Sequence, residues 1–229
     1  AAASIHPAHH VPVIAAPIVT DAIILDEAAS KAFLQPYGLD LPQNLVVKRQ
    51  ALPDTLPFGY PVVLKAMGQA HKSEMDGVKL NLADRAELEA AMAEMKQPIY
   101  LIEEMVGDGL IELLVGVVAD PAHGYLLTLA AGGVLTEILK DSVSLSLPVE
   151  EADILTGLEK LKIAPLLAGY RGKPAVDKAA LVTAVLAVQD CVLDNRASFS
   201  EIELNPLILT STRAVAVDAL IKTGGKSHG

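Results

Sequence analysis

The chain has 229 residues and a formal net charge of −10; 52 % of its residues are hydrophobic and only 3 % are aromatic. This length allows one large domain or two small ones with an aliphatic core, and the negative charge argues against nucleic acid bound through a broad basic face. The single Cys191 excludes an internal disulfide and a zinc site of several cysteines. No apolar run reaches the roughly 18 residues of a membrane span, and no signal peptide is recognisable, so we expect no membrane partner and a cytoplasmic location.

The N-terminal part predicts a linker followed by one helix. Residues 1–20 are rich in Ala, Pro and His and show no clear period, which favours an extended linker. Its histidines have no acidic or cysteine partner nearby, so a solvated tail is favoured over a metal site. A helix is expected to begin after Asp26 as N-cap and to end before Pro36 and Gly38. The stretch "LVVKR" at 45–49 is then a short strand candidate.

Two strand candidates flank an unusually long connection. One is an apolar run that ends at Lys65, and the other alternates apolar and polar residues at 78–82. Hairpin loops usually have about two to five residues, whereas "GQAHKSEMDG" between these strands is long and polar, with His71 at its centre. An ordinary surface histidine is one reading, and a nucleophile or phosphoryl carrier is the other. Lys65 suits either a phosphate-binding cation or an edge lysine whose ammonium reaches solvent.

A further helix and a series of strands complete the chain. The stretch "DRAELEAAMAEM" predicts an amphipathic helix with Asp84 as its N-cap. From residue 99 strands dominate, two helices follow near 150–162 and 177–194, and a last hairpin closes the chain. This order is neither all-helical, nor all-β, nor a regular βαβ alternation. It predicts an α+β fold in two lobes, with the boundary near Pro98.

Acidic residues inside apolar strands favour a polar ligand or a metal, because burying a carboxylate without a partner is costly. Glu112 interrupts "LIELLVGV", and Glu103 and Glu104 end the strand "IYLIEEM". Glu137 in "GVLTEIL" is explained equally well by a structural salt bridge. The glycine pair of "AAGGVLTEILKD" would let a backbone approach phosphate, although this pattern alone has low specificity.

The last hairpin predicts a specific cluster of oxygen atoms. Strand alternation places Glu203 and Asn205 on one face. A turn centred between Ser211 and Thr212 would put Asn205 opposite Asp218, with Cβ atoms about 5 Å apart. Two carboxylates and an amide oxygen form a hard ligand set suited to Mg²⁺. An ordinary polar strand face is the alternative.

Eight motifs in order along the chain, from about Leu25 to Leu220, resemble the ATP-grasp module of NDP-forming acyl-CoA synthetases. That module is the β-side of ADP-forming acetyl-CoA synthetase, a relative of the succinyl-CoA synthetase β subunit. The resemblance implies an ATP-grasp fold of two α+β lobes that hold a nucleotide between them. It implies a linker at 1–20, a helix at 21–44 packed on the larger lobe, a smaller lobe at 45–98 and a larger lobe at 99–229. The motifs are "LDEAASKAFLQPYGL", "GYPVVLK", "HKSEMDGV", "LIEEMV", "IELLVGVVADP", "AAGGVLTEILKD", "PLLAGYRGKPAVD" and "EIELNPLI…VAVDALI".

The resemblance also implies a reaction in which acid, CoA and ATP give acyl-CoA, ADP and phosphate, reversibly and through a phosphohistidine. The implied ligands are ATP or ADP and Mg²⁺, and the implied partner is a CoA-binding part in the same chain or in a separate α subunit. His71 resembles a second relay residue on the nucleotide side, which would account for the long connection. In the same way, Lys65 matches the lysine that contacts the phosphates, and Glu112 matches the acid near the ribose. Glu103, Glu104 and Met105 match the hinge that meets adenine. Asn205 and Asp218 match the Mg²⁺ ligands, with Glu203 beside them.

Three positions depart from the family pattern. Leu145 in "LKDSVSLSLP" stands where many members have an arginine, Asp76 displaces a glycine, and Ala130 replaces another. Loss of a cation near the phosphates would weaken transition-state stabilisation. The alternative function is therefore a degenerate ATP-grasp module that binds or senses a ligand, as in protein acyltransferases that resemble these synthetases. A structural interface domain that binds no nucleotide is the third reading.

Overall fold

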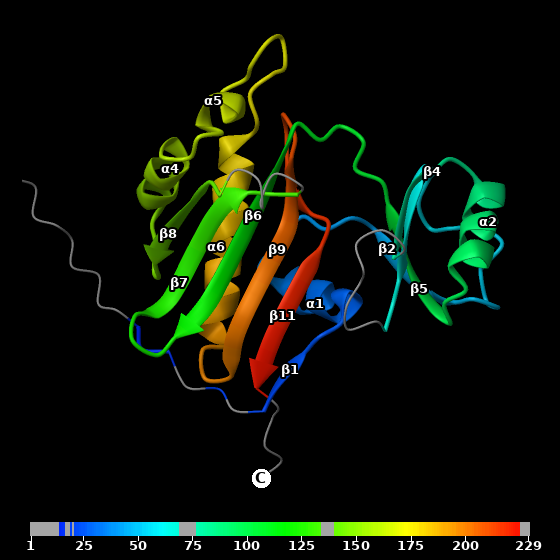
Figure 1. The fold of residues 1–229 in the computed structure, drawn as a ribbon, viewed down its shortest axis with the longest axis horizontal. Coiled ribbons are helices and arrows are strands. Elements are labelled where there is room, and N and C mark those ends of the chain that lie inside the picture. Colours follow the sequence, from blue (N-terminus) through cyan, green and yellow to red (C-terminus); the bar gives the residue numbers. More distant parts are fainter. Residues whose placement is uncertain (1–13, 17–18, 20, 69–76, 134–139, 225–229) are drawn as a thin grey trace, which may run out of the picture.

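The computed structural model describes residues 14–16, 19, 21–68, 77–133 and 140–224. Its strands form two antiparallel sheets, one of seven strands and one of four, which lie beside each other in Figure 1. We call the seven-stranded sheet with its helices the larger lobe, and the four-stranded sheet with its helix the smaller lobe. This arrangement confirms the α+β fold with two lobes. None of the described helices is long and apolar enough to cross a membrane.

The smaller lobe is a sheet covered on one face by a single helix, α2. Leu88 and Met92 of α2 pack against Val62 and Leu64 of the sheet, and all four side chains are buried. Asp84 caps the helix as predicted, because its carboxylate accepts a hydrogen bond from the backbone N–H three residues later. The strands run in the order β2-β5-β3-β4. The elements are β2 (Asn44–Lys48), β3 (Val62–Ala66), β4 (Val78–Leu82), α2 (Arg85–Met95) and β5 (Ile99–Glu104).

The predicted lobe boundary near Pro98 is wrong for the strand that follows it. β5 pairs with β2 on one side and with β3 on the other, so residues 99–104 form an inner strand of the smaller sheet rather than the start of the larger lobe. The change in composition near Pro98 marks the passage from the partly exposed helix α2 to a buried strand. The change near Pro98 is therefore a change of burial within one lobe and not a boundary between lobes.

The larger lobe is a sheet with helices on one face. Figure 1 shows α6 crossing behind the sheet, and buried side chains of α6 share one hydrophobic cluster with Ile202 and Leu204 of β9. Asp177 caps α6, because its carboxylate accepts a hydrogen bond from the N–H of Ala180 at 3.0 Å. Cys191 of α6 is fully buried and has a free thiol. The strand order is β1-β11-β9-β6-β7-β8, with β10 paired to β9.

Most elements of the larger lobe lie where the sequence predicts them, but β1, β8 and α5 were not predicted. The elements are β1 (Ala22–Ile24), β6 (Ile111–Asp120), β7 (Gly124–Ala131), β8 (Ser142–Ser146), α4 (Glu151–Glu159), α5 (Ala164–Leu167), α6 (Lys178–Asp194), β9 (Phe199–Leu209), β10 (Ala214–Ala216) and β11 (Ala219–Gly224).

Helix α1 (Glu27–Leu34) lies between β11 and the smaller lobe (Figure 1). It begins at the predicted N-cap, where the Asp26 carboxylate accepts from the N–H of Ala29 at 2.8 Å. Leu34 is buried in the core of the larger lobe, and the hydroxyl of Ser30 accepts from the N–H of Ile221 at 3.2 Å. A short 3-10 helix, Gln35–Tyr37, follows α1 directly. The helix is thus fixed to the larger sheet while one of its faces meets the smaller one.

Candidate functional site

The register of the last hairpin agrees with the prediction. β10 and β11 pair with β9 in one continuous register, which is the register of a turn centred between Ser211 and Thr212. Asn205 and Asp218 occupy opposing positions in this register, in the short gap between the pairs formed by β10 and those formed by β11. The backbone pairing therefore places these two residues opposite each other, as predicted.

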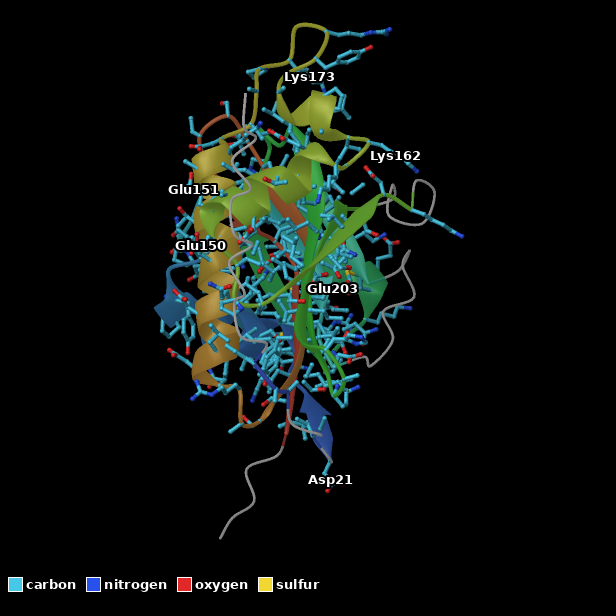
Figure 2. All side chains as sticks on the ribbon, turned by 90° about the vertical axis from the view of Figure 1, so that its left-hand side faces the viewer. Asp21, Glu150, Glu151, Lys162, Lys173 and Glu203 are labelled. Carbon is cyan, nitrogen blue, oxygen red and sulfur yellow. The ribbon has the colours of Figure 1, made fainter. Side chains whose placement is uncertain are left out.

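Glu203, Asn205 and Asp218 form a half-buried group of oxygen-bearing side chains. The Nδ2 group of Asn205 donates to Oε1 of Glu203 at 3.3 Å, and Oδ1 of Asn205 accepts from the backbone N–H of Gly133 at 3.2 Å. Figure 2 shows Glu203 on the side of the sheet that faces away from α6. These two contacts fix the orientation of the amide between a carboxylate and a backbone N–H.

The donor set of this group limits the kind of metal that fits it. In the part of the chain that the structure describes, no three His, Cys, Asp or Glu side chains gather as a potential metal site. Any ion here would therefore be held by two carboxylates and one amide, with its remaining positions filled by water or ligand oxygens. Mg²⁺ prefers this kind of incomplete, all-oxygen protein site.

Gly132 and Gly133, the glycine pair next to Asn205, lie so close to β6 that no larger residue fits at either position. The N–H of Gly132 donates to the carbonyl of Glu112 at 2.9 Å, and a Cβ on Gly132 would lie 2.5 Å from the carbonyl carbon of Leu113. Gly133 has φ +59°, and a Cβ there would lie 1.7 Å from Oε2 of Glu112. The exposed Glu112, predicted to lie near ribose, therefore sits against the same glycine that contacts Asn205. Glu137 lies outside the described residues.

Four charged side chains meet where the two lobes join, and we call Glu27, Lys31, Lys65 and Glu103 the four-charge cluster. The Nζ atom of Lys65 lies 2.5 Å from Oε1 of Glu27 and 2.8 Å from Oε2 of Glu103. The Nζ atom of Lys31 lies 2.9 Å from Oε1 of Glu27 and also pairs with Oε1 of Glu103. Two members come from α1 and two from the smaller sheet, and their formal charges cancel.

The four-charge cluster also reaches the hairpin of the larger lobe. Both lysines donate to the backbone carbonyl of Val217, Lys31 at 2.8 Å and Lys65 at 2.5 Å. Val217 directly precedes Asp218, the predicted metal ligand. The predicted phosphate lysine is therefore bonded to the residue beside the predicted metal site, although the two come from different lobes.

The two lysines of the cluster differ in their electrostatics. Burial and the neighbouring Lys65 lower the pKa of Lys31, more than the carboxylates of Glu27 and Glu103 raise it. Burial also lowers the pKa of Lys65, but Glu27, Glu103 and Asp218 together outweigh burial and raise it above its ordinary value. Lys65 is thus held as an ammonium ion at neutral pH.

The three residues predicted to lie at adenine include one member of this cluster, Glu103, and the two residues that follow it in the chain. The carboxylate of Glu103 is directed at the two lysines and is 1 % exposed, so any contact of this residue with a base falls to its backbone. The N–H of Glu104 donates to the carbonyl of Gln43, and the N–H of Met105 to that of Pro61. The roles of these residues at adenine stay predictions. His71 lies outside the described residues.

Glu27 and Lys31 were not singled out by the sequence analysis. Their spacing of four residues inside a helix with a clear N-cap is the usual signal of a helical ion pair. That signal indicates a solvated pair on the helix surface, whereas these side chains are 8 % and 1 % exposed. Only the packing of α1 against the smaller sheet brings them to Lys65 and Glu103.

Leu145, which stands where many family members have an arginine, lies in strand β8, and its side of the sheet can be determined. A Cβ on Gly157 of α4 would lie 3.4 Å from Cδ1 of Leu145, so Leu145 points to the helical side of the sheet. Ser142, Ser144 and Ser146 alternate with it and are exposed. An arginine side chain at position 145 in this register would therefore not face the same side as Glu203.

The open face of the larger sheet carries the candidate site. Pairing across five strands places one row of residues on this face, which comprises Leu220, Glu203, Gly116, Thr128 and Ser144. No described helix of this lobe covers the row in Figures 1 and 2, because α4 and α6 lie on the other side. Glu203 and, by strand alternation, Asn205 thus lie on the open face of the larger sheet.

Comparison with known proteins identifies similar chains. Residues 19–223 match the family model of an ATP-grasp domain. The ADP-forming acetate–CoA ligase II subunit beta of Pyrococcus furiosus is 32 % identical over 212 residues, which cover 85 % of this chain and 89 % of the relative. Trans-feruloyl-CoA synthase FCS1 from an unknown prokaryotic organism is 34 % identical over 214 residues. That match covers 86 % of this chain but only 30 % of the synthase.

A solved structure shows the same fold with ligands. It is dinucleotide forming acetyl-coenzyme A synthetase 1 of Ca. Korarchaeum cryptofilum, in complex with coenzyme A and Mg-AMPPCP, with its phosphohistidine segment pointing towards the nucleotide binding site. The two chains are 30 % identical with a TM-score of 0.75, and the match covers 86 % of this chain and 91 % of the other. The ATP-grasp fold expected from the sequence is thereby confirmed.

Proposed function

Because the chain belongs to the ATP-grasp domain family and nearly spans a β subunit of an ADP-forming acetate–CoA ligase, we propose that it is the nucleotide-binding, phosphoryl-transferring module of an NDP-forming acyl-CoA synthetase. The complete enzyme converts an acid, CoA and ATP to acyl-CoA, ADP and phosphate through a phosphohistidine, and the reaction is reversible. We assign selection of the acid to the CoA-binding part of the enzyme.

One observation carries the proposal. The ammonium of Lys65 from the smaller lobe is hydrogen-bonded to the carbonyl of Val217, which directly precedes Asp218 in the larger lobe. Asp218 lies opposite Asn205 in the register of the hairpin, and Asn205 donates to Glu203. A polyphosphate chain held between two lobes needs a fixed cation on one side and oxygen ligands for Mg²⁺ on the other. These two requirements meet here across the lobe junction.

Each residue then has a distinct role. Lys65 neutralises phosphate oxygens, and Asp218, Asn205 and Glu203 hold Mg²⁺, which supplies the positive charge that offsets the phosphates. Glu112 lies near the start of β6, against Gly133, and we assign it to ribose. The backbone of Glu103, together with Glu104 and Met105, is assigned to adenine.

The phosphoryl group has to leave this site for a second protein part. We propose that His71 accepts it, an assignment supported by the "HKS" motif and by the suitability of a neutral imidazole nitrogen as a nucleophile near pH 7. The partner is a CoA-binding part, present in the same chain or as a separate α subunit. This chain matches only 30 % of the feruloyl-CoA synthase, which fits an arrangement with both parts in one chain. It matches 89 % of the acetate–CoA ligase β subunit, which fits an arrangement with a separate α subunit.

One observation favours a second candidate, a degenerate module that binds a nucleotide without transferring its phosphoryl group. On the open face, β8 presents serines at 142, 144 and 146, while Leu145 points to the helical side. If an additional cation is needed beside the phosphates, β8 does not supply it. Nucleotide binding without phosphoryl transfer is the result that this candidate predicts.

Reconstitution tests the proposed function. The chain is combined with its CoA-binding part and supplied with an acid, CoA and MgATP, and acyl-CoA and ADP are measured. We expect both products in equal amounts from the combined parts and no acyl-CoA from the chain alone. Two results would contradict the proposal. One is formation of acyl-CoA by the chain alone, and the other is binding of ATP by the combined parts without formation of ADP.

A further inference from the structure

Lys31 and its neighbour Lys65 share three acceptors. Both ammonium groups contact the carboxylates of Glu27 and Glu103 and the carbonyl of Val217. Lys31 is also the more deeply buried of the two, at 1 % exposure against 7 % for Lys65. Two cations that compete for one set of acceptors are an unusual arrangement if only one of them has a function.

The charges of the cluster explain what a second cation provides. A carboxylate pair that loses its counter-ion inside a protein becomes very costly. If the ammonium of Lys65 turned to a phosphate, Glu27 and Glu103 would lose one of their two cations. Lys31 would remain, because α1 is fixed to β11 by the hydrogen bond between Ser30 and Ile221 at 3.2 Å.

We propose that Lys31 is a positioning residue for the nucleotide site. It is a fixed counter-cation that keeps Glu27, Glu103 and the Val217 carbonyl paired while Lys65 exchanges these acceptors for a nucleotide phosphate. The proposal rests on the proposed function, since a nucleotide phosphate is the group that draws Lys65 away. Lys31 itself touches no ligand and acts only through its neighbours.

Two explanations of the four-charge cluster predict different results. If the cluster only stabilises the fold, each of its members affects folding stability alone. If Lys65 exchanges its partners for a phosphate, the net charge of the groups around Lys65 determines how readily its ammonium turns to that phosphate. Lys31→Met makes that charge more negative and holds Lys65 more tightly, whereas adding Glu27→Gln removes one carboxylate and restores the balance.

Calorimetric titration with MgADP tests this difference in four variants. We expect Lys31→Met to weaken binding about tenfold or more, and Lys31→Met/Glu27→Gln to return to within about threefold of the wild type. Glu27→Gln alone should tighten binding about threefold, because one of the groups that hold Lys65 is gone. Lys79→Met is the matched control, since Lys79 pairs with Glu94 at 2.8 Å on the α2 side of the smaller lobe, and it should bind within about twofold of the wild type.

The outcomes separate the two claims. Wild-type affinity in Lys31→Met, or a double variant that binds no better than Lys31→Met, overturns the role of Lys31 and leaves the proposed function intact. If Lys31→Met does not fold, the double variant decides, and a tenfold loss there overturns the role. Absence of MgADP binding by the wild type contradicts the proposed function, and with it the exchange of Lys65.

Discussion

The backbone N–H of Gly133 donates a hydrogen bond of 3.2 Å to Oδ1 of Asn205, a residue 72 positions away in the sequence. This bond joins the glycine pair to the proposed metal ligands. A Cβ on the neighbouring Gly132 would lie 2.5 Å from the carbonyl carbon of Leu113 in β6. The glycine pair therefore has a structural reason that is separate from any contact with phosphate.

Gly132→Ala should destabilise the protein by about 2 kcal/mol or more, because the new Cβ would overlap backbone atoms that cannot move aside. The contact at issue is the 2.5 Å approach to the carbonyl carbon of Leu113. Urea denaturation measures the change in the free energy of unfolding. Gly59→Ala is the control, since a Cβ there meets nothing within 4 Å, and equal stability of the two variants would contradict the packing described here.

Asp218→Ala should weaken MgATP binding about a hundredfold while changing metal-free ATP binding by less than about threefold, because the lost carboxylate acts through the metal. Titration calorimetry with and without Mg²⁺ measures both affinities. Glu201→Gln is the matched control, because Glu201 lies on the same face of β9 but opposite Lys222. A similar loss with and without Mg²⁺ would remove Asp218 from the metal site.

Leu145→Arg should lower the thermal midpoint clearly, because it directs a guanidinium at the packed side of β8 beside Gly157. Ser144→Arg should leave the midpoint nearly unchanged, because position 144 is exposed on the open face. Scanning calorimetry compares the two variants, which differ by one position along the same strand. If both arginines are tolerated equally, the register of β8 is not the one described.

Cys191 should resist thiol reagents in the native protein. Burial, with a smaller effect of Asp194, raises the pKa of its thiol to about 12 from an ordinary 9.0. The folded thiol therefore keeps a proton that the unfolded thiol loses, and this contribution to stability is present below pH 9 and is lost as the pH rises towards 12. Cys191→Ala should remove that part of the alkaline loss of stability, and rapid native labelling near pH 8 would show that the thiol is not buried.

Local signals in the sequence were sufficient for helices α1, α2 and α6 and for the last hairpin. Asp26, Asp84 and Asp177 each accept a hydrogen bond from the N–H three residues later, a contact contained within one turn of chain. The register of β9 with β10 and β11 follows from the centre of a short turn and strand alternation. These features depend on neighbours in sequence, so the sequence determines them.

Features that depend on distant partners were not predictable. β5 reads as the start of the larger lobe until its pairing with β2 and β3 is known. β8 is an exception, because its serines alternate with Val143 and Leu145 as they do in a strand, and this local signal was missed. The four-charge cluster brings together α1, β3 and β5 with the carbonyl of Val217, and no local pattern reports such a meeting.

Calorimetric titration of the wild-type chain with ADP and with ATP, each with and without Mg²⁺, tests the central claim most directly. We expect one saturable site for each nucleotide, with affinity for ATP at least about tenfold higher in Mg²⁺ than in a chelator, or roughly 1.4 kcal/mol. Absence of binding to either nucleotide at millimolar concentration, with Mg²⁺ present and the chain folded, would contradict it.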